Sequence, residues 1–364
     1  MKQYLELLDK ILTEGVEKES GRPNMPNTIG ISNATIRMDL GEGFPLLTTK
    51  KMFLKGIIHE LLWFLRGDTN IKYLVDNGVN IWSSDAYRWY LTYAKDNGGL
   101  EQNCILRNNE NGTYSMYTYD EFIEVIKNTP EDKLPIYKFT EMYIKKHNGI
   151  KEYRLGDLGK VYGYQWRNQN GVDQIKDVIE GLKNNPYSRY HIIDSWNKVD
   201  FPEMALPPCH LLYQFIVRPM SFEERKNLIP ENIPNFLSHE DLDCYNIPKY
   251  FLDLNMYQRS CDIFLGVPFN LASMSLLLII IAKVSNMAPG IAYWIGGDTH
   301  LYLDHIPMAQ EQLKRTPNRL PYLTITKELK SLDDILELTI DDFVLSNYKS
   351  DKSIKAELFT GIKK

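Results

Sequence analysis

A cysteine that follows two prolines is the first candidate for chemistry in this chain. The stretch Leu206-Pro207-Pro208-Cys209-His210 lies between two apolar, strand-like runs, His191–Trp196 and Leu211–Val217. Proline fixes φ and has no backbone N–H, so a cysteine placed there lies on a rigid turn and is presented to its surroundings. Cysteine is nonetheless among the most buried residue types and usually behaves as a small hydrophobic side chain. Taken alone, the motif favours a buried thiol over a nucleophile.

A second stretch strengthens the case for catalysis at Cys209. Gln258-Arg259-Ser260-Cys261-Asp262 is followed closely by Gly266-Val267-Pro268-Phe269-Asn270. Together they offer a guanidinium, a hydroxyl, a carboxylate and a carboxamide in close succession. A guanidinium near a thiol lowers the thiol pKa and so favours the nucleophilic thiolate.

A glutamate in an apolar helix is the third candidate. Lys55–Leu65 is predicted to form a helix, and apolar residues surround Glu60 on every side of it. Carboxylates are almost never fully buried unless they are paired, because desolvation disfavours the charged form. Two explanations stay open: an ion pair at the next turn, for example with Arg66, or an acid, base or water-holding group in a cleft.

The elements that position these residues can be predicted from periodicity and from chain-breaking residues. Gly21–Asn33 is predicted to be a loop with Arg22 as its only strong cation, and Gly296–His300 a turn into the next helix. Helices are expected at Tyr4–Val16, Asp173–Lys183, Leu271–Val284 and Tyr302–Arg315, and strands at Asn33–Leu40, Tyr250–Tyr257 and Tyr322–Ile325.

Two polar segments are predicted to be insertions in one domain that spans residues 1–364, at about 87–155 and 218–248. The second separates two strand-like runs, Leu211–Val217 and Tyr250–Tyr257, which would otherwise form a hairpin. An ordinary hairpin loop has only about 2–5 residues.

Composition excludes several classes of protein. The 364 residues are 43% hydrophobic and 24% charged, which is ordinary globular composition. A net charge of −5 provides no general attraction to nucleic acid or to a membrane surface, so an anionic substrate would need local arginines. The four cysteines show no metal-binding spacing and indicate a reducing, cytoplasmic setting, and no metal is expected. The N-terminus lacks a signal-peptide pattern, and the apolar run Leu276–Ala282 is too short to span a bilayer.

The chain resembles the thymidylate synthase family along most of its length. The resemblance rests on six ordered blocks: Phe44–Lys50, His59–Ile71, Gly156–Arg167, Met204–Phe215, Tyr257–Ser273 and Gly297–His305. It implies an α/β (α+β) fold, with a large mixed β-sheet flanked by helices and with the sheets packed back to back in a homodimer.

The resemblance also implies a reaction. Family members methylate carbon 5 of the uracil ring of dUMP, with 5,10-methylenetetrahydrofolate as the donor of the carbon and the hydride. Carbon 5 becomes nucleophilic only after a thiolate adds to carbon 6, which is covalent catalysis. Cys209 matches the nucleophile, and Arg259 matches the arginine that holds the phosphate and faces the thiol.

Other family roles fall on single positions of this chain. Asn270 matches the carboxamide that pairs with uracil O4 and N3–H, and Glu60 and Tyr162 match the groups that order water and move protons. The substrate is further expected to contact Gln258, Ser260, which matches a phosphate ligand, and His300 and Tyr302, which match ligands of the 3′-hydroxyl. Asp262 matches the carboxylate that binds the pterin. The remaining wall of the folate site is implied at Ile81, Trp82, Leu206, Leu265, Gly266 and Phe269.

This sequence departs from the family pattern at several places. Two arginines normally reach the phosphate from the other subunit; Arg189 matches the first, but Tyr190 replaces the second and carries no charge. Arg22, which matches a further phosphate ligand, lies in an atypical loop, and Asp85 replaces a second tryptophan. The chain also runs past the aligned C-terminal end, through Gly361–Lys364.

The sequence therefore predicts a cytoplasmic, homodimeric enzyme that converts dUMP to dTMP, with neither nucleic acid nor membrane as partner. The alternative is a dUMP hydroxymethylase, in which water attacks the same methylene intermediate because a changed lid admits solvent. Asn270 disfavours a cytidylate-specific relative. The set Cys209, Glu60, Arg259, Asn270 and Asp262 disfavours a binding protein that has lost catalysis.

Overall fold

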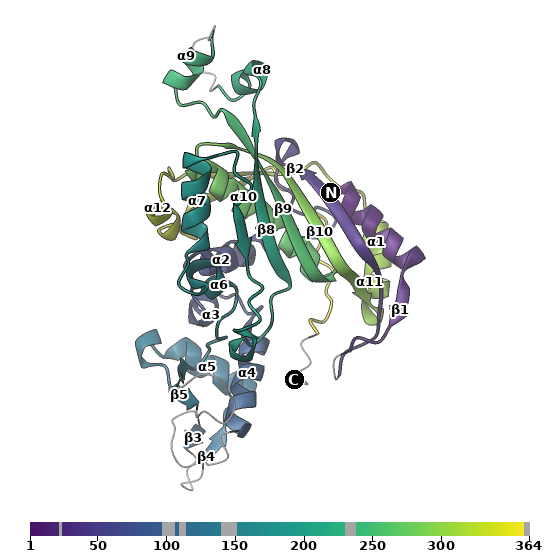
Figure 1. Ribbon diagram of the computed structural model, residues 1–364. Coiled ribbons are helices and arrows are strands. Elements are labelled where there is room, and N and C mark those ends of the chain that lie inside the picture. The colour runs from purple at the N-terminus through teal and green to yellow at the C-terminus, as the bar shows by residue number, and fades with distance from the viewer. Residues whose placement is uncertain (22–23, 97–105, 109–113, 140–150, 230–237, 360–364) are drawn as a thin grey trace.

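A six-stranded mixed sheet forms the centre of the computed structural model, in the order β1-β2-β10-β9-β8-β7 (Figure 1). The structure describes the chain except for residues 22–23, 97–105, 109–113, 140–150, 230–237 and 360–364. Strands β9 and β10 pair in parallel and the other neighbours are antiparallel. The strands are β1 (Val16–Lys18), β2 (Thr28–Asp39), β7 (Ile192–Asp194), β8 (His210–Pro219), β9 (Tyr250–Asp262) and β10 (Ala288–Tyr302).

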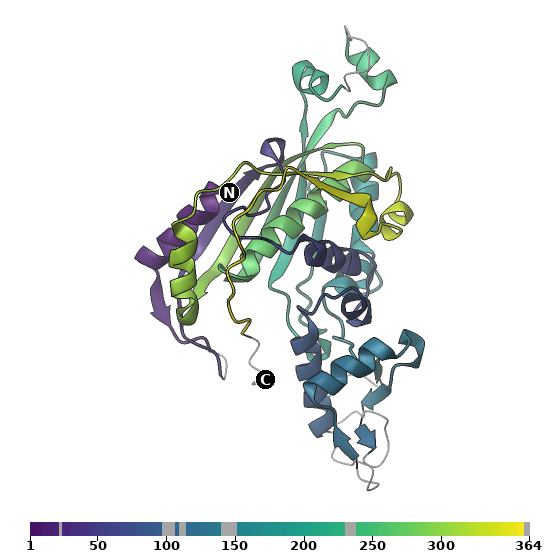
Figure 2. The same ribbon diagram turned by 180° about the vertical axis from the view of Figure 1, so that it is seen from behind.

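Helices cover one face of this sheet (Figure 2). On β8, the inward side chains Tyr213, Phe215 and Val217 belong to the main apolar core, whereas Ile216 between them is exposed. We call the uncovered side of the sheet, which carries Ile216, the open face. The helices of the main body are α1 (Lys2–Glu14), α2 (Leu54–Leu65), α3 (Lys72–Asp76), α6 (Tyr162–Asn168), α7 (Gln174–Asn184), α10 (Gly266–Val284), α11 (Ile306–Leu313) and α12 (Leu332–Leu336).

Helix α10 is the central helix of the core. It starts earlier than the expected Leu271, so that Phe269 and Asn270 lie in its first turns. Its length and composition would allow it to cross a membrane, but 72% of its apolar window is buried inside the fold, as is usual for a core helix. This mixed sheet with flanking helices confirms the fold class expected from the sequence.

The predicted turn at Gly296–His300 is wrong, because these residues continue β10 to Tyr302. A Cβ on Gly296 would lie 2.4 Å from the Trp294 ring and 2.5 Å from Thr299 Oγ1. The glycine therefore reflects close packing within a strand, which a local pattern cannot distinguish from a turn. The next helix accordingly starts late: α11 follows a 3₁₀ turn (Leu303–His305) and has proline in its first turn.

Two further local expectations are corrected. The loop predicted over Gly21–Asn33 ends early, because β2 begins at Thr28 and pairs with β10. The ion pair considered between Glu60 and Arg66 does not form. Arg66 instead donates to the carbonyls of Leu336 and Leu338, at 3.4 and 2.7 Å.

The two polar segments lie at opposite ends of the molecule (Figure 1). Near one end of the sheet, α8 (Phe222–Lys226) and α9 (His239–Cys244) surround a small apolar cluster of Leu242 and Ile247. The expected pairing of β8 with β9 across this segment is confirmed. The other segment holds most of α4 (Ser83–Asp96), together with β3 (Leu106–Asn108), β4 (Tyr114–Met116), α5 (Tyr119–Asn128), β5 (Ile136–Phe139) and β6 (Lys151–Arg154).

After α11 the chain forms a separate two-stranded ribbon, β11 (Tyr322–Ile325) with β12 (Phe343–Ser346), and then an irregular tail. The backbone N–H of Asp351 donates to the Thr48 carbonyl at 2.8 Å, and Arg315 donates to the Lys352 carbonyl at 2.7 Å. These contacts attach the tail to the main body before it reaches the cavity described next.

Candidate active site

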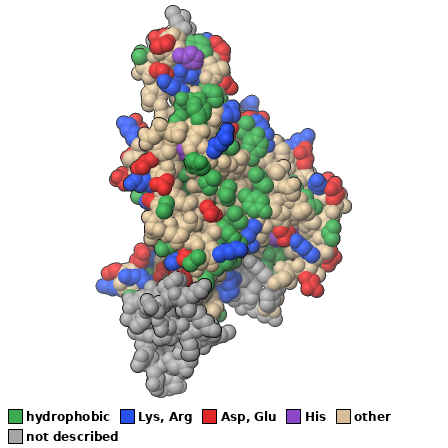
Figure 3. Space-filling view, viewed as in Figure 1, with side chains coloured by type: hydrophobic (Ala, Val, Ile, Leu, Met, Phe, Trp, Pro, Cys, Tyr) green, Lys and Arg blue, Asp and Glu red, His purple; other side chains and the backbone are tan. Residues whose placement is uncertain are grey.

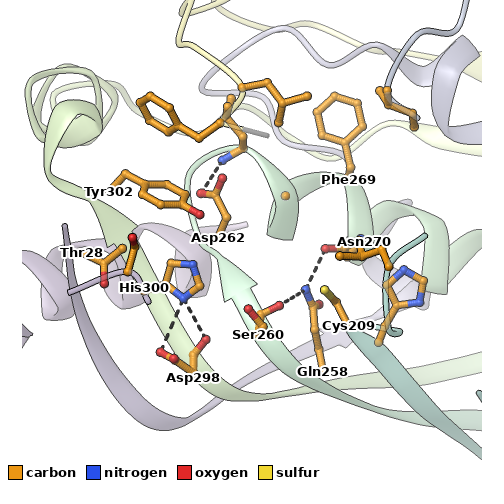
Figure 4. Close-up of a pocket in the computed structure, with 18 of the residues that line it drawn as sticks. Thr28, Cys209, Gln258, Ser260, Asp262, Phe269, Asn270, Asp298, His300 and Tyr302 are labelled. Atoms are coloured by element: carbon orange, nitrogen blue, oxygen red, sulfur yellow. Dashed lines mark hydrogen bonds and ion pairs between the residues drawn. The ribbon is translucent and has the colours of Figure 1, made fainter. Parts of the chain in front are cut away.

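One cavity of about 570 Å³ opens where β9, β10 and the first turn of α10 meet (Figure 4). Of the predicted site residues that the structure describes, it brings together all but Arg189 and Arg259. The predicted residues that line it are Glu60, Ile81, Trp82, Tyr162, Leu206, Cys209, Gln258, Ser260, Asp262, Leu265, Gly266, Phe269, Asn270, His300 and Tyr302.

Cys209 is a half-buried cysteine immediately before β8. Its backbone N–H donates to the Tyr162 hydroxyl oxygen at 2.6 Å, and its backbone carbonyl accepts from the backbone N–H of Arg259 at 2.8 Å. The turn predicted from the two prolines is thus fixed from both sides. Burial raises the Tyr162 pKa well above its usual 10, so the phenol stays protonated at neutral pH.

Arg259 supports this turn from outside the cavity. Its side chain points away from Gln258 and Ser260, because neighbouring residues of a strand face opposite sides. The guanidinium donates to the carbonyls of Pro208 and Pro207, at 2.7 and 2.9 Å, and lies 5.4 Å from the centre of the Trp196 ring. Arg259 therefore holds the segment that presents Cys209, and its phosphate-binding role stays a prediction.

Two successive hydrogen bonds, from Trp294 to Gln258 and from Gln258 to Asn270, fix the orientation of the Asn270 side chain. Trp294 Nε1, which can only donate, bonds to Gln258 Oε1 at 2.9 Å. The Gln258 Nε2 group then donates to Asn270 Oδ1 at 3.0 Å. Asn270 Nδ2 is left as a donor and Oδ1 keeps a second lone pair, which together complement a ring edge with one acceptor and one N–H.

Glu60 is a half-buried carboxyl in the cavity wall, and its pKa is unusual. Burial raises its pKa from 4.5 to about 7, and the hydrogen bond from Trp82 Nε1, at 2.8 Å, partly opposes this rise. The structure therefore favours the second of the two explanations for Glu60, because a carboxyl with this pKa exchanges protons at neutral pH.

His210 lies beside these groups and is kept neutral. Burial lowers its pKa to about 3, and its ring stacks on Tyr162 with centroids 4.3 Å apart. Its Nδ1 lies 2.6 Å from the Tyr213 hydroxyl, whose pKa burial raises well above 10. The two side chains share one hydrogen bond, whose donor depends on the tautomer of the imidazole.

Asp262 and His300 occupy the far side of the cavity, on neighbouring strands. One oxygen of Asp262 accepts the backbone N–H groups of Phe264 and Leu265, at 3.0 and 3.1 Å, just before α10 begins. His300 Nδ1 lies 3.2 Å from the Asp298 carbonyl and 3.5 Å from its carboxylate (Figure 4).

The C-terminal tail forms part of the wall of the cavity, through Ala356, Leu358 and Phe359. Phe359 stacks on the His305 ring at 4.9 Å and meets Tyr302 edge-on at 5.0 Å. His305 Nε2 lies 2.9 Å from the carbonyl of Glu357. The tail is therefore held against the cavity although the sequence continues beyond it.

Like Arg259, the predicted substrate ligand Arg189 is not among the residues that line this cavity. Arg22 lies outside the described residues. Arg189 is exposed, and its neighbour Tyr190 is 90% exposed. A contribution of Arg189 to a site on another subunit is not tested by one chain.

Sequence reasoning missed several residues of the cavity. His210 adjoins the nucleophile, and Asp298 precedes His300 by two positions, so strand alternation would have found it once β10 was assigned. Asp85, which replaces the family's second tryptophan, is ion-paired with Arg88. No local pattern identifies the others. The residues without a predicted role are Lys18, Glu19, Ser20, Thr28, Asp85, His210, Asp298, Ala356, Leu358 and Phe359.

This arrangement can hold a planar heterocycle by its polar edge, add a thiol to it and exchange protons at neutral pH. The apolar side chains of Ile81, Trp82, Leu206 and Phe269 can cover a second aromatic ligand. Within the described residues, no group of three or more His, Cys, Asp or Glu side chains is arranged to hold a metal ion.

Comparison with known proteins gives consistent matches. Residues 2–360 match the family model described as thymidylate synthase. A protein of that name from Mycoplasma mobile is 39% identical over 98% of this chain and 99% of its own. Those of the Aster yellows witches'-broom phytoplasma and of Mycoplasma pneumoniae are 40% and 38% identical, with the same coverage.

Proposed function

The chain belongs to the thymidylate synthase family, and we propose that its cavity converts dUMP and 5,10-methylenetetrahydrofolate to dTMP and dihydrofolate through a covalent adduct on Cys209. It is accordingly an enzyme, a one-carbon methyltransferase that acts on dUMP. The observation that carries the proposal is the convergence of Cys209, Asn270 and Glu60 on one cavity from three distant parts of the chain.

Cys209 starts the reaction in this proposal. Its thiolate adds to carbon 6 of the uracil, and the electron pair of the C5–C6 double bond moves onto O4 as an enolate. Carbon 5 then becomes nucleophilic. When the thiolate leaves again at the end, the double bond is restored and the enzyme is regenerated.

Asn270 orients the base during this step. Its Nδ2 donates to O4 and its Oδ1 accepts from N3–H, in the orientation that Gln258 supports through the 3.0 Å hydrogen bond. A cytosine edge presents an amino group and a bare nitrogen instead, so the same amide is mismatched to it. His300 and Tyr302 are assigned to the 3′-hydroxyl, and Ser260 to the phosphate.

Glu60 and Tyr162 handle protons in this proposal. Glu60, with its pKa of about 7, supplies a proton to O4 and takes one back near neutral pH. Tyr162, a neutral phenol whose hydroxyl oxygen accepts from the Cys209 N–H, orients the water that takes the proton from carbon 5 and passes it to solvent. His210 adds a neutral imidazole on the same side.

The residues around the second part of the cavity fit a reduced folate. Apolar walls suit the flat pterin and benzoyl rings, and the Asp262 oxygen that does not bind Phe264 or Leu265 can accept from pterin N–H groups. Ile81, Trp82, Leu206, Leu265, Gly266 and Phe269 would hold the rings. When bound, this co-substrate supplies the one-carbon unit and the hydride that reduces it.

The alternative hydroxymethylase is not favoured. The relatives reported above are named thymidylate synthase. The tail lies against the cavity through Leu358 and Phe359, which supports exclusion of water from the reacting carbon. The extension past the aligned end therefore does not by itself argue for hydration.

A homodimer is part of the proposal. Figure 3 shows apolar side chains gathered over the open face of the sheet, where Ile216 and Tyr257 are each 39% exposed. A contiguous apolar surface of this kind is typical of an interface. Packing two open faces together would place Arg189 of one subunit at the phosphate of the other. A thiol that acts as the nucleophile has to stay reduced, so the proposed role of Cys209 suits a reducing, cytoplasmic compartment.

One experiment tests the reaction directly. The purified protein is incubated with dUMP and methylenetetrahydrofolate, the nucleotide product is identified by mass, and dihydrofolate is followed by absorbance. We expect dTMP and dihydrofolate in equal amounts. Hydroxymethyl-dUMP without dihydrofolate would establish the alternative instead. The Cys209→Ser variant should bind dUMP but show no turnover, and normal turnover would remove Cys209 from the mechanism.

A further inference from the structure

Few of the described residues carry positive charge at the end of the cavity that is assigned to the nucleotide. Among the described residues that line the cavity, Lys18 is the only lysine or arginine, whereas Glu19 and Asp298 line the same region. Tyr190 has also replaced one cation expected at the phosphate. A phosphate monoester carries about −1.5 to −2 charges at neutral pH, so its site needs compensating cations.

Lys18 lies within reach of the expected phosphate position. Its Nζ is 2.6 Å from an Asp298 carboxylate oxygen. Asp298 is the direct partner of Ser260 in the parallel pairing of β10 with β9, and Ser260 is the hydroxyl assigned to the phosphate. The other Asp298 oxygen is 3.5 Å from His300, which is assigned to the sugar. Figure 4 shows Asp298, Ser260 and His300 gathered at this end.

We propose that Lys18 is a phosphate-binding residue of this site, which exchanges its ion pair with Asp298 for one with the dUMP phosphate. The inference rests on the proposed function, because it assumes that the nucleotide binds with its phosphate near Ser260. Lys18 then supplies part of the charge that Tyr190 does not, from the same chain that holds the nucleophile.

The present partner of Lys18 can be replaced at low cost. The side chains of Lys18 and Asp298 are 48% and 45% exposed, and exposed ion pairs contribute little net stability. A phosphate has more charge and more acceptor oxygens than one carboxylate, so it competes well for a lysine. The long lysine stem allows Nζ to move between the two acceptors without a change in the β1 backbone.

The test measures the affinity of Lys18→Met for dUMP and for deoxyuridine, which lacks the phosphate. We expect the dissociation constant for dUMP to rise about tenfold, because one charge-assisted contact is lost. The dissociation constant for deoxyuridine should change little. The dependence of dUMP binding on salt should weaken as well. Lys18→Arg should keep most of the affinity. Lys10→Met is the matched control, since Lys10 is 54% exposed and also ion-paired, but lies on α1 and does not line the cavity.

Equal losses for dUMP and deoxyuridine, or no loss for either, would overturn the proposal. If Lys18→Met does not fold, the Asp298→Asn variant tests the proposal instead, because it removes the carboxylate partner of Lys18 and leaves Lys18 available to the phosphate. The affinity for dUMP should then rise relative to that for deoxyuridine, and an unchanged or lower ratio contradicts the inference. Failure of the wild-type protein to bind dUMP at all would refute the proposed function, so the two failures are distinguishable.

Discussion

Replacing Glu60 with glutamine should stabilise the folded protein above neutral pH while it removes a catalytic group. Burial raises the Glu60 pKa from 4.5 to about 7. Between these two values the folded protein keeps a proton that the unfolded chain has lost. The protonated Glu60 of the folded state therefore adds to the free energy of unfolding. This contribution is fully present below pH 4.5 and is lost as the pH rises through about 7.

The size of this effect follows from the pKa difference. Each pKa unit corresponds to about 1.4 kcal/mol, so the interval from 4.5 to about 7 corresponds to about 3 kcal/mol. Glutamine has no proton to lose, and its carbonyl can still accept from Trp82. Relative to the wild type, Glu60→Gln should gain stability between these pH values and reach a plateau of about 3 kcal/mol above pH 7.

Unfolding in guanidinium, followed by tryptophan fluorescence at several pH values between about 5 and 8, measures the difference in the free energy of unfolding between variant and wild type. All measurements use one protein concentration, roughly micromolar, because the stability of a dimer depends on concentration. A difference between variant and wild type that does not change with pH would refute the reasoning, and so would one that falls as the pH rises.

The same substitution should cost activity. Glutamine cannot transfer a proton, so the turnover number should fall by about 10²-fold or more. Because the Glu60 pKa is about 7, turnover of the wild type is expected to change with pH around that value, and this dependence should disappear in the variant. Catalytic groups in unfavourable surroundings often reduce stability, so replacing Glu60 is expected to raise the stability of the fold and to lower turnover. Unchanged turnover would exclude a proton-transfer role.

Three further predictions concern the base, the tail and the dimer. Asn270→Asp should improve dCMP relative to dUMP by at least about tenfold in kcat/KM, because a carboxyl can complement the cytosine edge; unchanged kinetics for both would mean that Asn270 does not read the base. Deletion from Glu357 onward removes Phe359 and its 4.9 Å stacking on His305, so hydroxymethylated or abortive product should increase; an unchanged product ratio would show that the tail does not exclude water. Unfolding and refolding a mixture of Cys209→Ser and Arg189→Ala chains should recover activity, up to about a quarter of the wild-type value if the heterodimer has one intact site; proven heterodimers without activity would argue against shared sites.

Much of the catalytic half of the site could be predicted from short stretches of sequence. The double proline before Cys209 presents the thiol in any fold that places a strand after it, because proline restricts the chain locally. Gln258, Ser260 and Asp262 alternate along a strand, so they reach the same cavity once β9 forms. The isolation of Glu60 among apolar residues already indicated an unusual carboxyl.

Other features were decided only when distant segments met. The partner of Glu60 is Trp82 and not Arg66, because the packing of α2 against neighbouring elements, and not helical spacing, determines which side chain reaches the carboxyl. Gly296 reads locally as a turn residue, yet pairing with β9 and contact with Trp294 make it part of β10.

The sequence by itself thus determined which side chains are candidates for chemistry, since the thiol of Cys209 after two prolines, the carboxamide of Asn270 and the carboxyl of Glu60 among apolar residues can be identified from short stretches. The tertiary structure decided the surroundings of that chemistry. It bonded the Arg259 guanidinium to the carbonyls of Pro207 and Pro208, brought Lys18 to Asp298 across 280 positions of the sequence and placed Phe359 against His305. These contacts join segments with no local relation, and their positions follow from strand order and core packing, which no short stretch of sequence encodes.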